Sequence, residues 1–197
     1  MKTEGLKALV VGLGKTGLAA ANRLCELGAE VTVTDKRNAQ ELGSQIALLD
    51  KKARTAVGGY DDDIGVMFDI VVPSPGVDWN SGLLQNFRNR GIKVISEIEL
   101  AFRLASSRWV AVTGTNGKTT TTSMVGDILK KAGIKCTVCG NIGNPAIGEN
   151  FIFDKDATVV AEVSSFQLEA VDRVAPAVAA ILNVTPDHLD RHGSMEN

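Results

Sequence analysis

The sequence has few cysteines, few aromatic residues and no long apolar run. Three cysteines among 197 residues are too few for a disulfide framework. The longest apolar run, at 174–182, contains a proline and is far too short to span a bilayer. We expect no signal peptide, and no basic block points to nucleic-acid binding. These absences favour a cytoplasmic protein with neither a membrane nor a nucleic acid as partner. We also expect a monomer.

The residues that are present are typical of a globular protein with one or two domains. Hydrophobic residues make up 44% of the chain, charged residues 22%, and the formal net charge is −2. Glycine is abundant, with 20 residues, and many glycines stand at the ends of apolar runs. Glycines in such positions favour an α/β protein whose turns hold phosphate groups.

Short runs rich in Val and Ile alternate with longer helix-like segments, a pattern typical of βαβ units and a parallel sheet. We predict an N-terminal Rossmann-like domain over 1–96, followed by a P-loop α/β domain over 97–197. The second domain is expected to be truncated, because the chain stops soon after a strand and no covering helix follows. The predicted strands are 7–11, 30–34, 53–57, 68–72, 92–95, 109–113, 134–139, 158–163 and 177–184, the last two buried. The predicted helices are 16–27, 81–90, 97–105 and 119–132.

A glycine motif, GLGKTG at 12–17, lies between the first predicted strand and the first predicted helix. Its glycines allow a tight turn, so that a diphosphate can sit on the helix N-terminus. Asp35, at the end of the second strand, suits a ribose hydroxyl. Lys36 and Arg37 beside it add cations for a phosphate or a uridine-type ligand. The motif therefore predicts a nucleotide site, without specifying NAD.

A second phosphate loop, GTNGKTT at 114–120, follows the strand at 109–113. Backbone N–H groups of such a loop face phosphate oxygens, Lys118 adds a positive charge, and Thr119 can bind Mg²⁺. The loop departs from the full P-loop spacing, because its first glycine lies three rather than five positions before Gly117. We predict ATP binding here.

Two further residues point to the same ATP site. Glu162 ends an apolar strand, where an unpaired carboxylate would be costly, so an ion or a paired cation is expected beside it. His188 lies just beyond the next predicted strand. Because ligands bind at the carboxyl ends of parallel strands, we predict that both residues approach one Mg–nucleotide.

Other patterns are interpreted as structural. Cys136 and Cys139, with His188 and His192, imitate the spacing of zinc ligands, but the pairs are too far apart in sequence. We therefore predict packing cysteines. The acidic run Asp61–Asp63 is interpreted as a solvated loop.

Four segments together give the chain a specific resemblance to the Mur ligase family, cytoplasmic enzymes that build the peptide stem of bacterial cell-wall precursors. These segments are GLGKTGLAAANRL, CGNIGNP, AEVSSFQLE and LNVTPDHLDRH. The resemblance implies UDP-N-acetylmuramoyl-L-alanine and D-glutamate as substrates, and ATP-dependent amide formation through an acyl phosphate. It also implies a C-terminal amino-acid-binding domain that is absent here, so the chain should bind ligands without catalysing the reaction.

The resemblance also implies roles for single residues. It assigns catalytic roles to Lys118 and His188, and magnesium ligation to Thr119, Glu162 and His188. The implied ATP-binding residues are Gly114, Thr115, Asn116, Gly117, Lys118, Thr119 and Thr120. The implied substrate-binding residues are Lys15, Thr16, Asp35, Lys36, Arg37, Ser74, Gly76, Asn141 and Ser164.

Two other function classes remain open. A nicotinamide-dependent oxidoreductase would use the loop at 12–17 with Asp35, but leaves the second phosphate loop without a purpose. A non-catalytic P-loop module, such as a GTPase-type switch, would use the loop at 114–120. Such a switch should carry an Asn-Lys-x-Asp motif that recognises guanine, and the sequence has none.

Overall fold

The computed structural model describes residues 1–59 and 67–196. The chain forms two compact units, neither of them continuous in sequence. The first comprises Met1–Leu104, Pro145–Gly148 and Phe166–Val174, and the second comprises Ala105–Asn144, Glu149–Ser165 and Ala175–Asn197. The acidic run Asp61–Asp63 lies outside the described residues.

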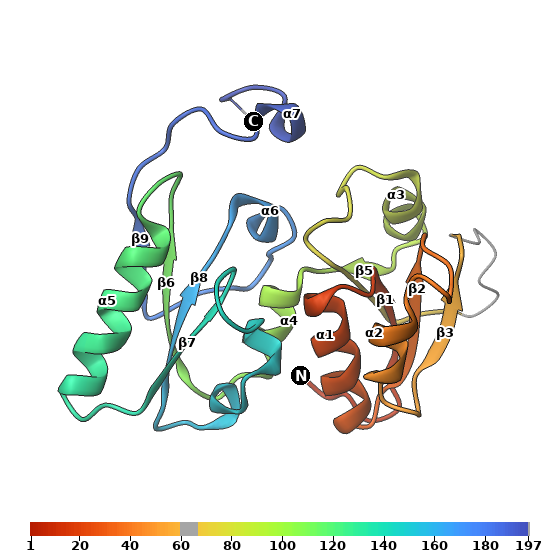
Figure 1. Cartoon of the computed structure of the whole chain (residues 1–197), viewed down its shortest axis with the longest axis horizontal. Helices are drawn as coiled ribbons and strands as arrows, with labels where there is room; N and C mark the ends of the chain where they lie inside the picture. The colour runs from red at the N-terminus through yellow and green to blue at the C-terminus, as the bar shows by residue number, and fades with distance from the viewer. Residues whose placement is uncertain (60–66, 197) are drawn as a thin grey trace. The chain divides into compact units, whose positions relative to one another are not determined.

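The first unit is a parallel five-stranded sheet with strand order β3-β2-β1-β4-β5. Helix α1 joins β1 to β2 and packs against both (Figure 1). The predicted Rossmann-like α/β architecture is confirmed. The strands are β1 (Lys7–Val11), β2 (Glu30–Asp35), β3 (Arg54–Val57), β4 (Ile70–Pro73) and β5 (Lys93–Val94), and the helices are α1 (Lys15–Glu26), α2 (Gly43–Ala47), α3 (Gly82–Asn89), α4 (Glu97–Leu104) and the 3-10 turn η1 (Ala146–Gly148).

One cluster of the first unit's core lies between the sheet and α3. Leu9 and Val71, on adjacent strands, pack with Leu84. The rings of Phe68 and Phe87 pack edge to face, with their centroids 6.3 Å apart. Burial of such side chains contributes about 1.5–3 kcal/mol each. This packing holds the glycine-rich turn after β1 on a rigid support.

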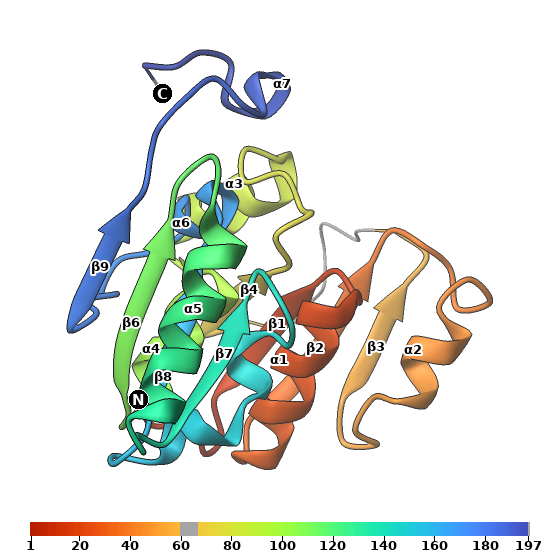
Figure 2. The same ribbon diagram turned by 60° about the vertical axis from the view of Figure 1, so that its left-hand side comes forward.

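The second unit is a parallel four-stranded sheet with order β7-β8-β6-β9, and α5 follows β6 (Figure 2). Its elements are β6 (Arg108–Thr113), α5 (Lys118–Lys131), β7 (Cys136–Gly140), the 3-10 turn η2 (Asn150–Phe153), β8 (Thr158–Glu162), β9 (Val178–Ile181) and α7 (Leu189–His192). The short helix α6 spans Ser165–Leu168. Its first residue belongs to the second unit, and the other three belong to the first. A P-loop α/β architecture is therefore present, as predicted.

One expectation about this sheet is wrong. β9 was expected to be buried, but Val178 is 57% and Ile181 71% exposed. Within the described part of the chain, β9 pairs with β6 alone and forms an edge of the sheet. An apolar run predicts a strand, but it does not show how many neighbours the strand has.

The cysteines behave as packing residues. Cys25, Cys136 and Cys139 are all buried, and none of them forms a disulfide within the described residues. No group of three or more His, Cys, Asp or Glu side chains within 1–59 and 67–196 is placed to hold a metal ion. In the same described part, no helix has the length and apolar character needed to cross a bilayer.

Candidate functional site

The glycine motif of the first unit forms a tight turn between β1 and α1. Gly12 has φ +91°, in the left-handed region that favours glycine. A Cβ at Gly17 would lie 1.8 Å from the Gly12 carbonyl oxygen, so a side chain there would force the helix away from the turn. The turn thus brings the first residues of α1 directly beside the end of β1, as a diphosphate site requires.

Asp35 braces this turn. Its Oδ2 accepts the backbone N–H of Leu13 at 2.7 Å and Nη2 of Arg37 at 2.7 Å. Its Oδ1 accepts the backbone N–H and Nε of Arg37 at 2.9 and 3.0 Å. The hydrogen bond from the Arg37 side chain is the main cause that lowers the pKa of Asp35 to about 2. All four acceptor positions of the carboxylate are filled, so a ligand hydroxyl must displace an Arg37 donor to reach it.

The other predicted substrate-binding residues of this unit differ in exposure and in their contact with this turn. Ser74 is tied to it, because its hydroxyl donates to the Gly12 carbonyl at 2.8 Å. Lys15 and Lys36 are exposed, and Thr16 is half-buried in the first turn of α1. Gly76 is exposed and borders open space.

The phosphate loop of the second unit lies between β6 and α5. Gly117 has φ +83° and caps the helix, which begins at Lys118. The Lys118 ammonium donates to the carbonyls of Gly114 at 2.7 Å and Thr115 at 3.0 Å. Lys118 therefore curls back over its own loop, with its charge where phosphate oxygens would be neutralised.

Asn183, which the sequence reasoning missed, braces this loop. Its side chain accepts the Asn116 N–H at 2.8 Å and donates to the Asn116 carbonyl at 2.9 Å. Its backbone carbonyl accepts the Thr115 N–H at 3.1 Å. The residue was assigned to the interior of a strand, whereas β9 ends at Ile181. A polar residue directly after an apolar run was the signal that could have identified it.

Glu162 joins the phosphate loop to a neighbouring turn. It is 1% exposed, its Oε2 accepts the Thr119 hydroxyl at 2.8 Å, and its Oε1 accepts the Asn141 amide at 2.8 Å. Both donors are neutral, so these hydrogen bonds rather than a side-chain cation satisfy the Glu162 carboxylate within the protein, and an ion beside it stays a prediction. Thr119 and Glu162 supply the hard oxygen ligands that Mg²⁺ prefers, and the pair fits that ion.

The close approach of Asn141 depends on a glycine before it. Gly140 has φ +104°, and a Cβ there would lie 2.3 Å from the Glu162 carbonyl oxygen. That carbonyl accepts the Asn141 backbone N–H at 2.9 Å. Asn141 was predicted to face the substrate, and the structure places its amide against Glu162.

His188 lies on a different segment from this cluster. It is exposed, has φ +50° and ψ +36°, and precedes α7, with its Nε2 3.8 Å from Oδ2 of Asp187. Ser164 is half-buried just beyond β8. Of the three predicted magnesium ligands, Thr119 and Glu162 are joined directly by the hydrogen bond described above.

Two protein-family models match the chain. Residues 6–96 match the family described as Mur ligase MurD-like, N-terminal domain, and residues 112–197 match the Mur ligase middle domain. Together the two matches cover both halves of the chain.

Curated relatives align along the whole chain. A UDP-N-acetylmuramoylalanine–D-glutamate ligase of Koribacter versatilis is 48% identical over 197 residues, and one of Alkaliphilus oremlandii is 45% identical over 200 residues. Each alignment covers 100% of this chain but 44% of the relative, so the chain spans less than half the length of these enzymes. Among solved structures, UDP-N-acetylmuramate-alanine ligase from Thermotoga maritima shares the fold, with a TM-score of 0.56 and 23% identity over 95% of this chain and 44% of that one.

Proposed function

Because the chain belongs to the Mur ligase family, we propose that it carries the UDP-substrate and ATP sites of a ligase that joins D-glutamate to UDP-N-acetylmuramoyl-L-alanine. The observation that carries the proposal is a phosphate loop in each unit, one braced by Asp35 and the other linked to Glu162. An oxidoreductase with one dinucleotide site would leave the loop at 114–117 without a ligand.

The proposed reaction activates a carboxylate. The γ-phosphoryl group of ATP passes to the L-alanyl carboxylate, which releases ADP and gives an acyl phosphate. The amine of D-glutamate then attacks the acyl carbon, and phosphate and a proton leave. Phosphoryl transfer needs mainly positioning and charge neutralisation. Lys118 supplies a cation at the loop, while Thr119 and Glu162 would hold Mg²⁺, which neutralises phosphate charge when bound.

The proposed roles of the two sites are separate. The turn at 12–17, with Lys15, Thr16 and Arg37, would bind the diphosphate and uridine of the substrate. Asn141 and Ser164 would face its muramoyl-alanine end, and His188 would act at the magnesium ions.

The chain alone is proposed to bind these ligands without turnover, since it spans 44% of the length of its relatives. The cytoplasmic location, the monomeric state and the absence of nucleic-acid or membrane partners stay predictions.

Calorimetry on the chain tests this assignment. The parent chain should bind UDP-N-acetylmuramoyl-L-alanine, and it should bind ATP in the presence of Mg²⁺. Lys118→Ala should weaken ATP binding by at least about tenfold, because a charge-assisted contact contributes about 1.5–3 kcal/mol to the binding free energy. Lys131→Ala, at the exposed far end of α5, is the matched control and should bind both ligands normally.

The same titrations separate the alternatives. Binding of NAD⁺ in place of the UDP substrate would support the oxidoreductase. Loss of UDP-substrate binding in Lys118→Ala would contradict the separation of the two sites. A phosphate-release assay with all substrates should show no turnover by the chain.

A further inference from the structure

A cavity of about 650 Å³ opens in the first unit at the amino ends of its strands. Leu6 immediately precedes β1, Ile70 begins β4 and Lys93 begins β5, and all three line it. The glycine turn at 12–17 lies at the opposite, carboxyl end of β1. A five-residue strand spans about 16 Å, so the cavity is separate from the candidate nucleotide site.

The cavity has an apolar part and a cationic part. Leu6, Ile70 and Phe102 supply the apolar surface, whereas Lys93, Arg103 and Arg173 supply cationic side chains. The α-amino group of Met1 also reaches this wall, where it donates to the Arg103 carbonyl at 3.1 Å. Asp69 is the acidic lining residue, and its Oδ2 accepts the Lys7 N–H. Cations therefore outnumber acids among the lining residues themselves, while two acids outside the lining, Glu99 and Asp172, pair with Arg103.

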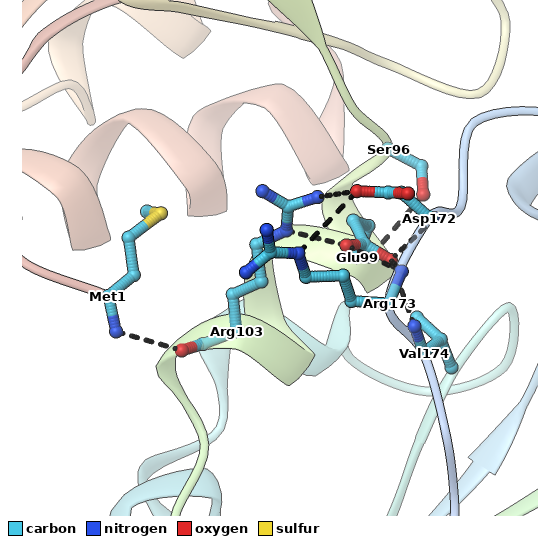
Figure 3. A network of polar contacts seen from close by, with 7 residues as sticks. All are labelled: Met1, Ser96, Glu99, Arg103, Asp172, Arg173 and Val174. Carbon is cyan, nitrogen blue, oxygen red and sulfur yellow. Dashed lines mark hydrogen bonds and ion pairs between the residues drawn. The ribbon is translucent and has the colours of Figure 1, made fainter.

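The guanidinium of Arg103 is held in place from behind. Its Nε donates to Oε1 of Glu99, one turn earlier on α4, and its Nη2 donates to Asp172 at 2.9 Å (Figure 3). The Arg103 side chain is only 10% exposed. A side chain fixed in this way loses little further conformational entropy when it binds a ligand.

Glu99 also positions Arg173. Its fully buried carboxylate accepts the consecutive backbone N–H groups of Asp172, Arg173 and Val174 at 3.0–3.2 Å (Figure 3). Burial opposes its ionisation, but the N–H groups of Asp172 and Arg173, together with Arg103, outweigh burial and lower the pKa of Glu99. The backbone beside the cavity is therefore anchored, and the Arg173 side chain extends from it, 69% exposed.

We propose that this cavity binds a small organic anion with a flat apolar body, such as an aryl carboxylate. The anionic group would meet Lys93, Arg103 and Arg173, and the ring would lie on Leu6, Ile70 and Phe102. The volume lies within the range of about 300–1,000 Å³ found for small-molecule sites. Oδ2 of Asp172 lies 2.9 Å from Nη2 of Arg103 and 3.6 Å from Nε of Arg173. The Asp172 carboxylate therefore competes with the ligand's anionic group for these two guanidinium groups.

Fluorine NMR with 4-(trifluoromethyl)benzoate as the probe tests the proposal on the chain itself. The benzoate should bind saturably, while 4-(trifluoromethyl)benzamide, which has the same ring without the charge, should bind at least about threefold more weakly. Inorganic phosphate alone should compete poorly, because it lacks the apolar body. UDP should not displace the probe, since its proposed site lies at the other end of the strands.

Three variants test the assigned residues. Lys93→Gln and Arg173→Gln should each weaken the benzoate by about three- to fivefold, because each removes one exposed cation. Asp172→Asn should strengthen it by a similar factor, since this substitution removes the competing carboxylate and leaves the backbone N–H bonded to Glu99. Lys52→Gln, an exposed lysine of the same unit outside the cavity, is the matched control. Thermal unfolding checks that each variant is folded.

Equal affinities for the benzoate and the benzamide would overturn the proposal, as would displacement of the probe by UDP. Unchanged affinity in folded Lys93→Gln and Arg173→Gln would also overturn it. Tighter binding by Asp172→Asn together with normal binding by Lys52→Gln supports it.

Discussion

Glu97 and Ile147, fifty residues apart in sequence, are joined by a hydrogen bond in which Oε1 of Glu97 accepts the Ile147 N–H at 2.7 Å. Glu97 is 1% exposed, and its Oε2 is buried without a hydrogen-bond partner in the described structure. Arg23 holds the same segment from α1, donating to the carbonyls of Ile147 and Gly148 at 3.0 and 3.1 Å. The carboxyl group of Glu97 from α4 and the guanidinium of Arg23 from α1 thus hold the turn η1 against the rest of the first unit.

This relationship predicts a pH-dependent stability. Burial raises the pKa of Glu97 to about 7, from an ordinary value of about 4.5, so between these values the folded protein keeps a proton that the unfolded chain loses. The free energy of unfolding should therefore fall as the pH rises from about 4.5 to 7, by up to about 3 kcal/mol. Glu97→Gln cannot ionise and should flatten this part of the profile, measured by urea denaturation at several pH values.

The control for this experiment is Glu30→Gln, at an exposed position on β2. It should reproduce the parent profile. A Glu97→Gln profile parallel to the parent's across pH 4.5–7 would show that the Glu97 carboxyl is not the group that titrates there.

Two glycines of the same turn should respond differently to alanine. Gly17→Ala would place a Cβ 1.8 Å from the Gly12 carbonyl oxygen, so the free energy of unfolding should fall by about 1–3 kcal/mol or more. Gly14→Ala meets no atom within 4 Å and has φ −86°, so stability should change little. Thermal denaturation measures both, and equal destabilisation would contradict the close packing described for Gly17.

Asp35→Ala should weaken binding of the UDP substrate by about 1.5–3 kcal/mol, because it removes the acceptor that orients Leu13 and Arg37. ATP affinity should remain within about twofold, since the phosphate loop belongs to the other unit.

Because the pKa of Asp35 in the folded protein is lowered to about 2, Asp35 contributes stability above about pH 4 that is lost as the pH falls toward 2. Calorimetry with both ligands and acid denaturation measure these effects, and equal losses for both ligands would indicate unfolding instead.

Glu162→Gln should abolish most of the effect of Mg²⁺ on ATP binding. The amide preserves the size of the side chain but lacks the negative charge that a hard cation prefers. ATP titrations with Mg²⁺ and with EDTA should differ strongly for the parent and little for the variant. Asp156→Asn, an exposed acid in the same unit, should behave as the parent does. A full Mg²⁺ effect in Glu162→Gln would remove Glu162 from the proposed ligands.

The sequence alone determined the alternation of strands and helices and the positions of the two glycine-rich loops. The predicted strand 7–11 agrees with β1 residue for residue, and the predicted helix 119–132 differs from α5 by one position at each end. Both are continuous segments that end at glycines, so hydrophobic pattern and turn chemistry within one segment were sufficient. The five-residue α2 was missed, because it is too short to show a helical period.

Only the tertiary structure decided which polar groups meet. Asp35 reaches Leu13 across 22 residues, Asn183 reaches Asn116 across 67, and Glu99 reaches Val174 across 75. The apolar pattern of β9 likewise predicted a strand but not its exposed position at the sheet edge. A local pattern reports the conformation of neighbouring residues, whereas these contacts arise when separate segments pack and buried polar groups must find partners.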